Sequence, residues 1–292
     1  MAATRRRPTK SAAKTTKSSA KRSSTRRRAS ADTTRRIVNL VPSRDTEQDW
    51  RYHDAVGSGA LTAVAAVPAS VDLRQPWWTI GDQEDTGSCV GWATAEGVLR
   101  YHFATLGKVP QATMLSPRFI WMGSKETDQY TTRPQSFIEE AGTSLKAAMN
   151  VARKYGVVTN DTLPFHIATK MYTGSENTFY AMASQCRIAS YFNMGKDTNQ
   201  WKSWLASHGP ILVGLSVDAT WDNATNTGGN LDVFDPNTVR GGHAVALVGY
   251  LPNGRFIVRN SWNTTWGDQG FAYASPQYIA AGFFNESYGV TI

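Results

Sequence analysis

The chain has 292 residues, of which 41% are hydrophobic and 11% aromatic, enough for one large domain or two small ones. The net charge of +8 is unevenly distributed: residues 1–36 hold thirteen Lys/Arg and one acidic residue, a charge of +12, which leaves −4 for the remainder. No stretch approaches the roughly 20 consecutive apolar residues of a membrane-spanning helix, which argues against an integral membrane protein.

Residues 1–36 are predicted to form a disordered basic tail. After Met1 the tail contains no Val, Leu, Ile, Phe, Tyr or Trp, so burial cannot offset the entropy of ordering it. Such a tail binds nucleic acid or another polyanion through phosphate contacts, and a merely solvated tail is the alternative. Because no apolar core follows a short basic start, we expect a cytoplasmic protein. Secretion through an unusual leader that uses the apolar run 60–67 is the competing interpretation.

Residues 37–70 are interpreted as a linker or a short prosegment, and a globular domain is predicted over residues 71–292. The first half of this domain is expected to be helical. Apolar residues at three- and four-residue steps predict a helix over 88–106, with Ser88 as its N-cap and Cys89 in its first turn. A helix N-terminus stabilises a thiolate. Further helices are predicted from Ser116-Pro117 and after Thr143.

The second half is expected to be rich in strands. Strands are predicted at Cys186–Phe192, Ile211–Val217, Gly241–Tyr250, Phe256–Trp262 and Phe271–Tyr273, with a short helix over Thr198–His208 and a long polar loop over 222–240. The turn residues between Tyr250 and Phe256 indicate a hairpin that brings His243 and Asn260 close together. Helices first and strands later predict an α+β fold.

Three separated motifs carry chemistry. Gln83 precedes Cys89 by six residues, His243 follows a pair of glycines, and Asn260 begins an Asn-Ser-Trp segment. Cys, His and Asn in this order are typical of papain-type enzymes. The chain resembles the papain-like cysteine peptidases, of the divergent bacterial and archaeal type, over about residues 70–290. The matching segments are Val71–Arg74, Gln83–Trp92, Gly242–Val245, Asn260–Trp262 and Trp266–Gly270.

The resemblance implies the architecture. A helical N-terminal subdomain, about residues 71–165, would pack against a β-rich, barrel-like C-terminal subdomain, about residues 166–292. The active cleft would lie between them.

The resemblance also implies the role of each site residue. The Cys89 thiolate would attack a peptide carbonyl and form a thioester acyl-enzyme. His243 would pair with Cys89 and protonate the leaving amine, and Asn260 would orient the imidazole. Gln83 and the Cys89 amide would form an oxyanion hole, and Trp262 would shield the Asn260–His243 hydrogen bond from water.

The predicted function is therefore a cysteine endopeptidase acting on polypeptide substrates as a monomer, with no cofactor and no metal. Cys186 is left without a partner, so no structural disulfide is expected. Two alternatives stay open at this point. One is a catalytically inactive papain-fold binding protein whose basic tail does the cellular work, and the other is a thioester acyltransferase.

The segment 37–70 is shorter than the usual inhibitory prosegment of the family. We therefore expect it to pack on the domain surface, anchored by an apolar residue such as Trp50, and to leave the cleft open. The competing hypothesis is a zymogen in which this segment blocks Cys89.

Overall fold

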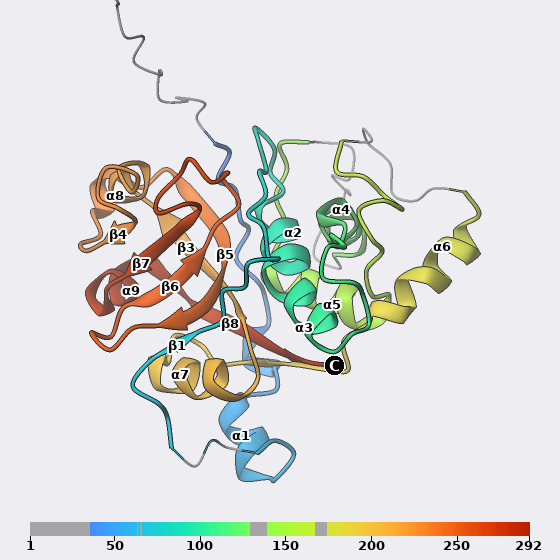
Figure 1. The fold of residues 1–292 in the computed structure, drawn as a ribbon, viewed down its shortest axis with the longest axis horizontal. Coiled ribbons are helices and arrows are strands. Elements are labelled where there is room, and N and C mark those ends of the chain that lie inside the picture. Colours follow the sequence, from blue (N-terminus) through green and yellow to red (C-terminus); the bar gives the residue numbers. More distant parts are fainter. Residues whose placement is uncertain (1–35, 63, 65, 129–138, 167–173) are drawn as a thin grey trace, which may run out of the picture. The chain divides into compact units, whose positions relative to one another are not determined.

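The structure is a computed structural model that describes residues 36–292, except residues 63, 65, 129–138 and 167–173 (Figure 1). The predicted basic tail therefore lies almost wholly outside the described residues. Among the helices that the structure describes, none has the length and apolar character of a membrane-crossing segment.

The helices of the first half arise where the sequence predicts them. A continuous helix comprises α2 (Cys89–Thr94), one π-helical turn (Ala95–Leu99) and α3 (Arg100–Thr105). It is followed by α4 (Pro117–Thr127) and α5 (Leu145–Lys154). Helix α6 (Glu176–Ala183) was not predicted, and it lies in the half that was expected to be rich in strands. The remaining helices are α1 (Tyr52–Gly57), α7 (Thr198–Ser207), α8 (Ala219–Asp222) and α9 (Pro276–Gly282).

Of the two N-caps that the sequence predicts, one is confirmed. The Ser116 hydroxyl caps α4 by accepting a hydrogen bond from the Phe119 amide at 3.1 Å, which satisfies an amide that the helix itself cannot. The predicted cap at Ser88 is wrong in detail. Ser88 precedes α2, but its hydroxyl hydrogen-bonds the Thr86 hydroxyl at 2.6 Å and caps no helix amide.

The strands form one mixed sheet. They are β1 (Val71–Asp72), β2 (Ser190–Asn193), β3 (Ile211–Val217), β4 (Asn230–Leu231), β5 (Gly241–Tyr250), β6 (Phe256–Arg259), β7 (Phe271–Ala274) and β8 (Phe283–Thr291). The spatial order is β2-β8-β3-β5-β6-β7-β4, with β1 paired to the far end of β5. This path is open at both ends, so the predicted barrel-like subdomain is a curved sheet without closure.

The sequence predictions for this half need correction at several points. The strand predicted over Phe256–Trp262 ends at Arg259, and the loop predicted over 222–240 contains the short strand β4. The strand predicted from Cys186 begins only at Ser190, because residues Ser184–Cys186 form a 3-10 turn that follows α6. The long C-terminal strand β8 was not predicted. Its sequence lacks a clean alternation, yet it pairs with both β2 and β3.

Strand β5 separates two hydrophobic cores because its side chains alternate between the two faces of the sheet. Ala244, Ala246 and Val248 face the core shared with α2 and α5. Val245 and Leu247 face the core shared with α7 and α9. The alanines let the helix that begins with α2 approach closely: a Cβ at Gly97, in its π-helical turn, would come within 2.9 Å of the Ala246 Cβ. This packing sets the N-terminus of α2 beside the start of β5.

Candidate active site

Cys89 is the first residue of α2, and its side chain is fully buried. The backbone amides of Cys89, Val90 and Ala244 lie close to its sulfur and favour its charged form. The first two belong to the helix N-terminus, and the third follows His243 on β5. The thiol thus lies where α2 meets the strand that carries the histidine.

His243 and Asn260 are brought together by the β5–β6 hairpin, as the turn residues predict. The His243 Nε2–H group donates to Asn260 Oδ1 at 2.8 Å. The other ring nitrogen, Nδ1, makes no hydrogen bond with the part of the chain that the structure describes. The Trp262 ring lies 5.0 Å from the imidazole and is itself buried, so water has little access to the His243–Asn260 bond.

Gln83 lies in the loop between β1 and α2 and is tied to the Asn-Ser-Trp segment. Its Oε1 accepts hydrogen bonds from the Ser261 hydroxyl at 3.0 Å and from Trp262 Nε1 at 3.1 Å. These bonds fix the orientation of the amide. Its Nε2 donates to the carbonyls of Thr86 and Ile37, each at 3.1 Å. The donor predicted for the oxyanion hole is therefore occupied by residue 37 of the same chain.

The acceptor at Gln83 belongs to an extended segment, residues 36–41, that we call the strap. Figure 1 shows the strap passing between the sheet and α2. The Leu40 amide donates to the Gly242 carbonyl at 2.9 Å, next to His243, and the Val41 amide donates to the Thr143 carbonyl at 3.1 Å on the helical side. A Cβ at Gly241 would overlap the Val38 carbonyl oxygen, so only glycine lets the strap lie this close.

The strap overturns the prediction that this segment leaves the cleft open. Its backbone bonds both sides of the site, which closes it. The predicted anchor is also wrong, because Trp50 is 62% exposed. The segment is held instead by Asp49, whose carboxylate contacts Lys146 Nζ at 2.7 Å and accepts from the Tyr288 hydroxyl at 2.9 Å. Tyr52 is buried against Trp204 nearby.

Burial also sets the protonation state of the site in this closed form. It raises the pKa of the Cys89 thiol to about 11 and lowers the pKa of His243 to about 4, although the Asn260 hydrogen bond opposes the second shift. Both groups are therefore neutral near pH 7. The thiolate that the helix N-terminus predicts is not favoured here, since desolvation outweighs the opposing effect of the three backbone amides.

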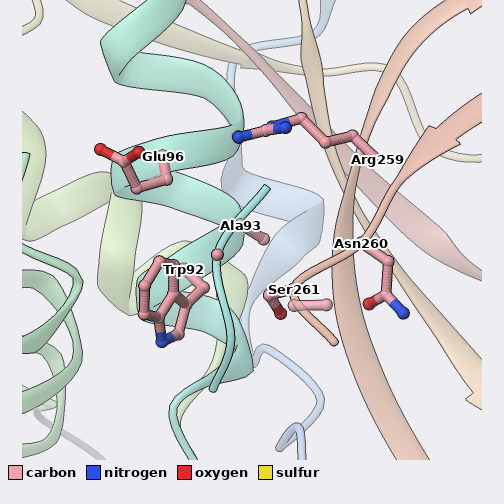
Figure 2. Close-up of a pocket in the computed structure, with 9 residues that line it drawn as sticks. Trp92, Ala93, Glu96, Arg259, Asn260 and Ser261 are labelled. Carbon is pink, nitrogen blue, oxygen red and sulfur yellow. The ribbon is translucent and has the colours of Figure 1, made fainter. Parts of the chain in front are cut away.

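A buried ionic cluster lies next to the site, and it was not predicted from the sequence. A narrow cavity separates α2 from the end of β6, with Glu96 on one side and Arg259 on the other (Figure 2). Arg100 Nη1 pairs with Glu96 at 2.7 Å, and Arg259 donates to the carbonyls of Trp78 and Thr79. Arg259 thereby ties the loop that leads to Gln83 to the strand that leads to Asn260. The sequence signal for this cluster is the pair Glu96 and Arg100, two charged residues four positions apart in a largely apolar helix.

Comparison with known proteins identifies the family. The family model described as papain family cysteine protease matches residues 67–287, and the chain belongs to this family. The predicted class, a cysteine peptidase with an α+β papain-like fold, is thus confirmed. The solved structure of xylellain, a cysteine protease from Xylella fastidiosa, has the same fold. Its TM-score is 0.71 at 23% identity, and the match covers 88% of this chain and 97% of that one.

Two relatives indicate how far the sequence similarity extends. Macrodontain-1 of Ananas macrodontes is 25% identical over 212 residues, which are 70% of this chain and 88% of that protein. An uncharacterised peptidase C1-like protein of Acanthamoeba polyphaga mimivirus is 28% identical over 217 residues, which are 68% of this chain but 65% of that protein.

Proposed function

We propose that the protein hydrolyses peptide bonds with Cys89 as nucleophile, His243 as acid and base, and Asn260 as the residue that orients the imidazole. The observation that carries this proposal is the 2.8 Å hydrogen bond from His243 Nε2 to Asn260 Oδ1. This bond leaves Nδ1 without a partner among the described residues, on the strand whose next residue, Ala244, brings its backbone amide to the Cys89 sulfur. An imidazole fixed at one nitrogen presents the other to a nucleophile.

The chemistry requires the site to be open. Once water and substrate reach the pair, the Cys89 proton passes to His243 and the sulfur attacks the carbonyl carbon. The carbonyl oxygen gains negative charge, and Gln83 Nε2 and the Cys89 amide stabilise it; such a donor is worth about 3 kcal/mol of barrier. The C–N bond then breaks as His243 gives its proton to the amine. Water, deprotonated by His243, hydrolyses the thioester.

We further propose that the strap holds the protein latent. Gln83 Nε2 cannot bind a substrate carbonyl while it donates to Ile37, and Gly242 cannot accept from a substrate amide while it accepts from Leu40. The neutral thiol and imidazole are a second barrier, because only the thiolate is reactive. Displacement or cleavage of the strap would remove both barriers.

The test uses the full chain with Cys186→Ser, so that Cys89 is the one thiol left. A thiol-reactive vinyl sulfone peptide should label this protein, faster after limited proteolysis within residues 36–70, and peptide hydrolysis should rise in parallel. Cys89→Ala should abolish both signals. Hydrolysis that survives Cys89→Ala would refute the proposal, and peptide transfer to an added amine in preference to water would favour an acyltransferase.

The basic tail is a separate proposal: residues 1–36 bind nucleic acid or another polyanion. Their charge of +12 against −4 for the remainder supports it. Retention of the full chain on heparin, compared with a chain that lacks residues 1–35, tests it.

A further inference from the structure

Asp82 is an acidic residue directly before Gln83, the glutamine proposed for the oxyanion hole. Arg36 of the strap pairs with its carboxylate. Arg36 meets Asp82 through two contacts, Nη1 to Oδ1 at 2.8 Å and Nη2 to Oδ2 at 3.0 Å. The arginine and aspartate side chains are only 12% and 26% exposed. A two-pronged and partly buried pair of this kind is stronger and more selective than an exposed ion pair.

The loop around Asp82 is built to hold the carboxylate in place. Asp82 Oδ1 accepts from the Glu84 amide at 2.8 Å, and the Asn263 amide donates to the Gly81 carbonyl at 3.0 Å. Glu84 and Asn263 both adopt left-handed backbone conformations, with φ of 53° and 67°, which non-glycine residues adopt only when the surroundings require it. The carboxylate therefore does not depend on Arg36 for its position.

Arg240 contacts the backbone of the strap at Arg36. Arg240 Nη1 donates to the Arg36 carbonyl at 2.8 Å, while Nη2 pairs with Asp222 at 2.7 Å. The next carbonyl along the strap, that of Ile37, is the one bound by Gln83 Nε2. Asp82 thus contacts a side chain one residue away from the carbonyl that occupies the glutamine donor.

We propose that Asp82 is a specificity residue that selects arginine at one fixed position of the polypeptide substrate, beside the bond that is cleaved. This inference rests on the proposed peptidase function. The strap occupies the same subsite in the latent protein with its own Arg36. Any polypeptide whose carbonyl replaces that of Ile37 on Gln83 passes Asp82 with a neighbouring side chain. Arginine suits this subsite better than lysine because its planar guanidinium matches both carboxylate oxygens.

The test uses the full chain with Cys186→Ser and a loosened strap, made by Arg36→Ala and Leu40→Ala. Peptides are compared in pairs that carry arginine or citrulline, its uncharged isostere, at one scanned position. At one position kcat/KM should favour arginine by about tenfold or more, as expected for a hydrogen-bonded charge pair. Asp82→Asn should bring this ratio close to one, and Asp82→Glu should retain most of it.

Asp85→Asn is the matched control, because Asp85 is an exposed acid on the same loop. It removes the same charge and should leave the arginine-to-citrulline ratio unchanged. Equal ratios in Asp82→Asn and Asp85→Asn, or no position with an arginine preference, would overturn the inference. Thermal unfolding of each variant shows whether it is folded, and the Asp82→Glu result separates loss of charge from loss of structure.

A second measurement distinguishes this inference from the peptidase proposal. The same peptides are tested for protection of Cys89 against alkylation by iodoacetamide, which needs no turnover. Arginine-selective protection that depends on Asp82, without cleavage of any peptide, would refute the peptidase and support the subsite. Cleavage without arginine preference would support the peptidase and refute the subsite.

Discussion

Leu40→Ala is the perturbation that tests the closed site most directly. Leu40 is 5% exposed and belongs to the core cluster that includes Leu145 and Ala244. Truncation of a buried leucine to alanine costs about 2–5 kcal/mol. We take about 2 kcal/mol, because the strap lies at the edge of this core. The open fraction of the site should then rise about thirtyfold.

The assay is the rate at which iodoacetamide alkylates Cys89 in the Cys186→Ser background, at fixed pH and low reagent concentration. Under these conditions the rate follows the equilibrium population of the open form. Leu40→Ala should increase it by about thirtyfold, and hydrolysis of a fluorogenic peptide should increase with it. Val41→Ala is the control, because Val41 is the adjacent strap residue and 47% exposed; we expect a change of less than about threefold.

One result would refute the reasoning. If Leu40→Ala and Val41→Ala react at the same rate as the parent protein, the strap does not limit access to Cys89. The contacts of Leu40 would then contribute to stability alone, and the melting temperature would fall without any gain in activity.

Three further predictions concern the same molecule. In the Leu40→Ala background, His243→Ala should lose nearly as much peptide hydrolysis as Cys89→Ala, whereas Asn260→Ala should retain part of it because it orients and does not react; steady-state kinetics on one peptide checks the order. The rate of Cys89 alkylation in the closed protein should rise with pH with a midpoint near pH 11, because the thiol loses its proton around its raised pKa of about 11. Leu40→Ala should shift this midpoint to lower pH as the thiol regains water. A midpoint that does not move would contradict the role of burial. Deletion of residues 1–35 should abolish retention on heparin near physiological salt while peptide hydrolysis is kept, and a retained truncated protein would reveal a basic patch on the folded part.

Local signals predicted much of the fold. A continuous apolar run defines β3 at Ile211–Val217, and turn residues between two such runs define the hairpin that joins His243 to Asn260. Apolar periodicity defines the helix that begins at Cys89. These features depend on neighbours in sequence, so a single chain without relatives is enough to recognise them. The strand β8 was missed because the polar run Asn285-Glu286-Ser287 interrupts its apolar pattern, although the segment pairs with both β2 and β3.

The candidate site, like the fold, could be predicted from the sequence only in part. Residue types and their order along the sequence were enough to predict Gln83, Cys89, His243 and Asn260 as site residues, since these four lie in three separate motifs. Only the tertiary structure revealed that Leu40 and its neighbours in the strap close the site, and that burial neutralises the thiol and the imidazole. The sequence does not reveal this closure, because the strap is held by hydrogen bonds of its backbone amides and carbonyls. Every residue type except proline has both groups, so residue type does not show which of them pair. The pKa of a group likewise depends on how much water the folded chain leaves around it.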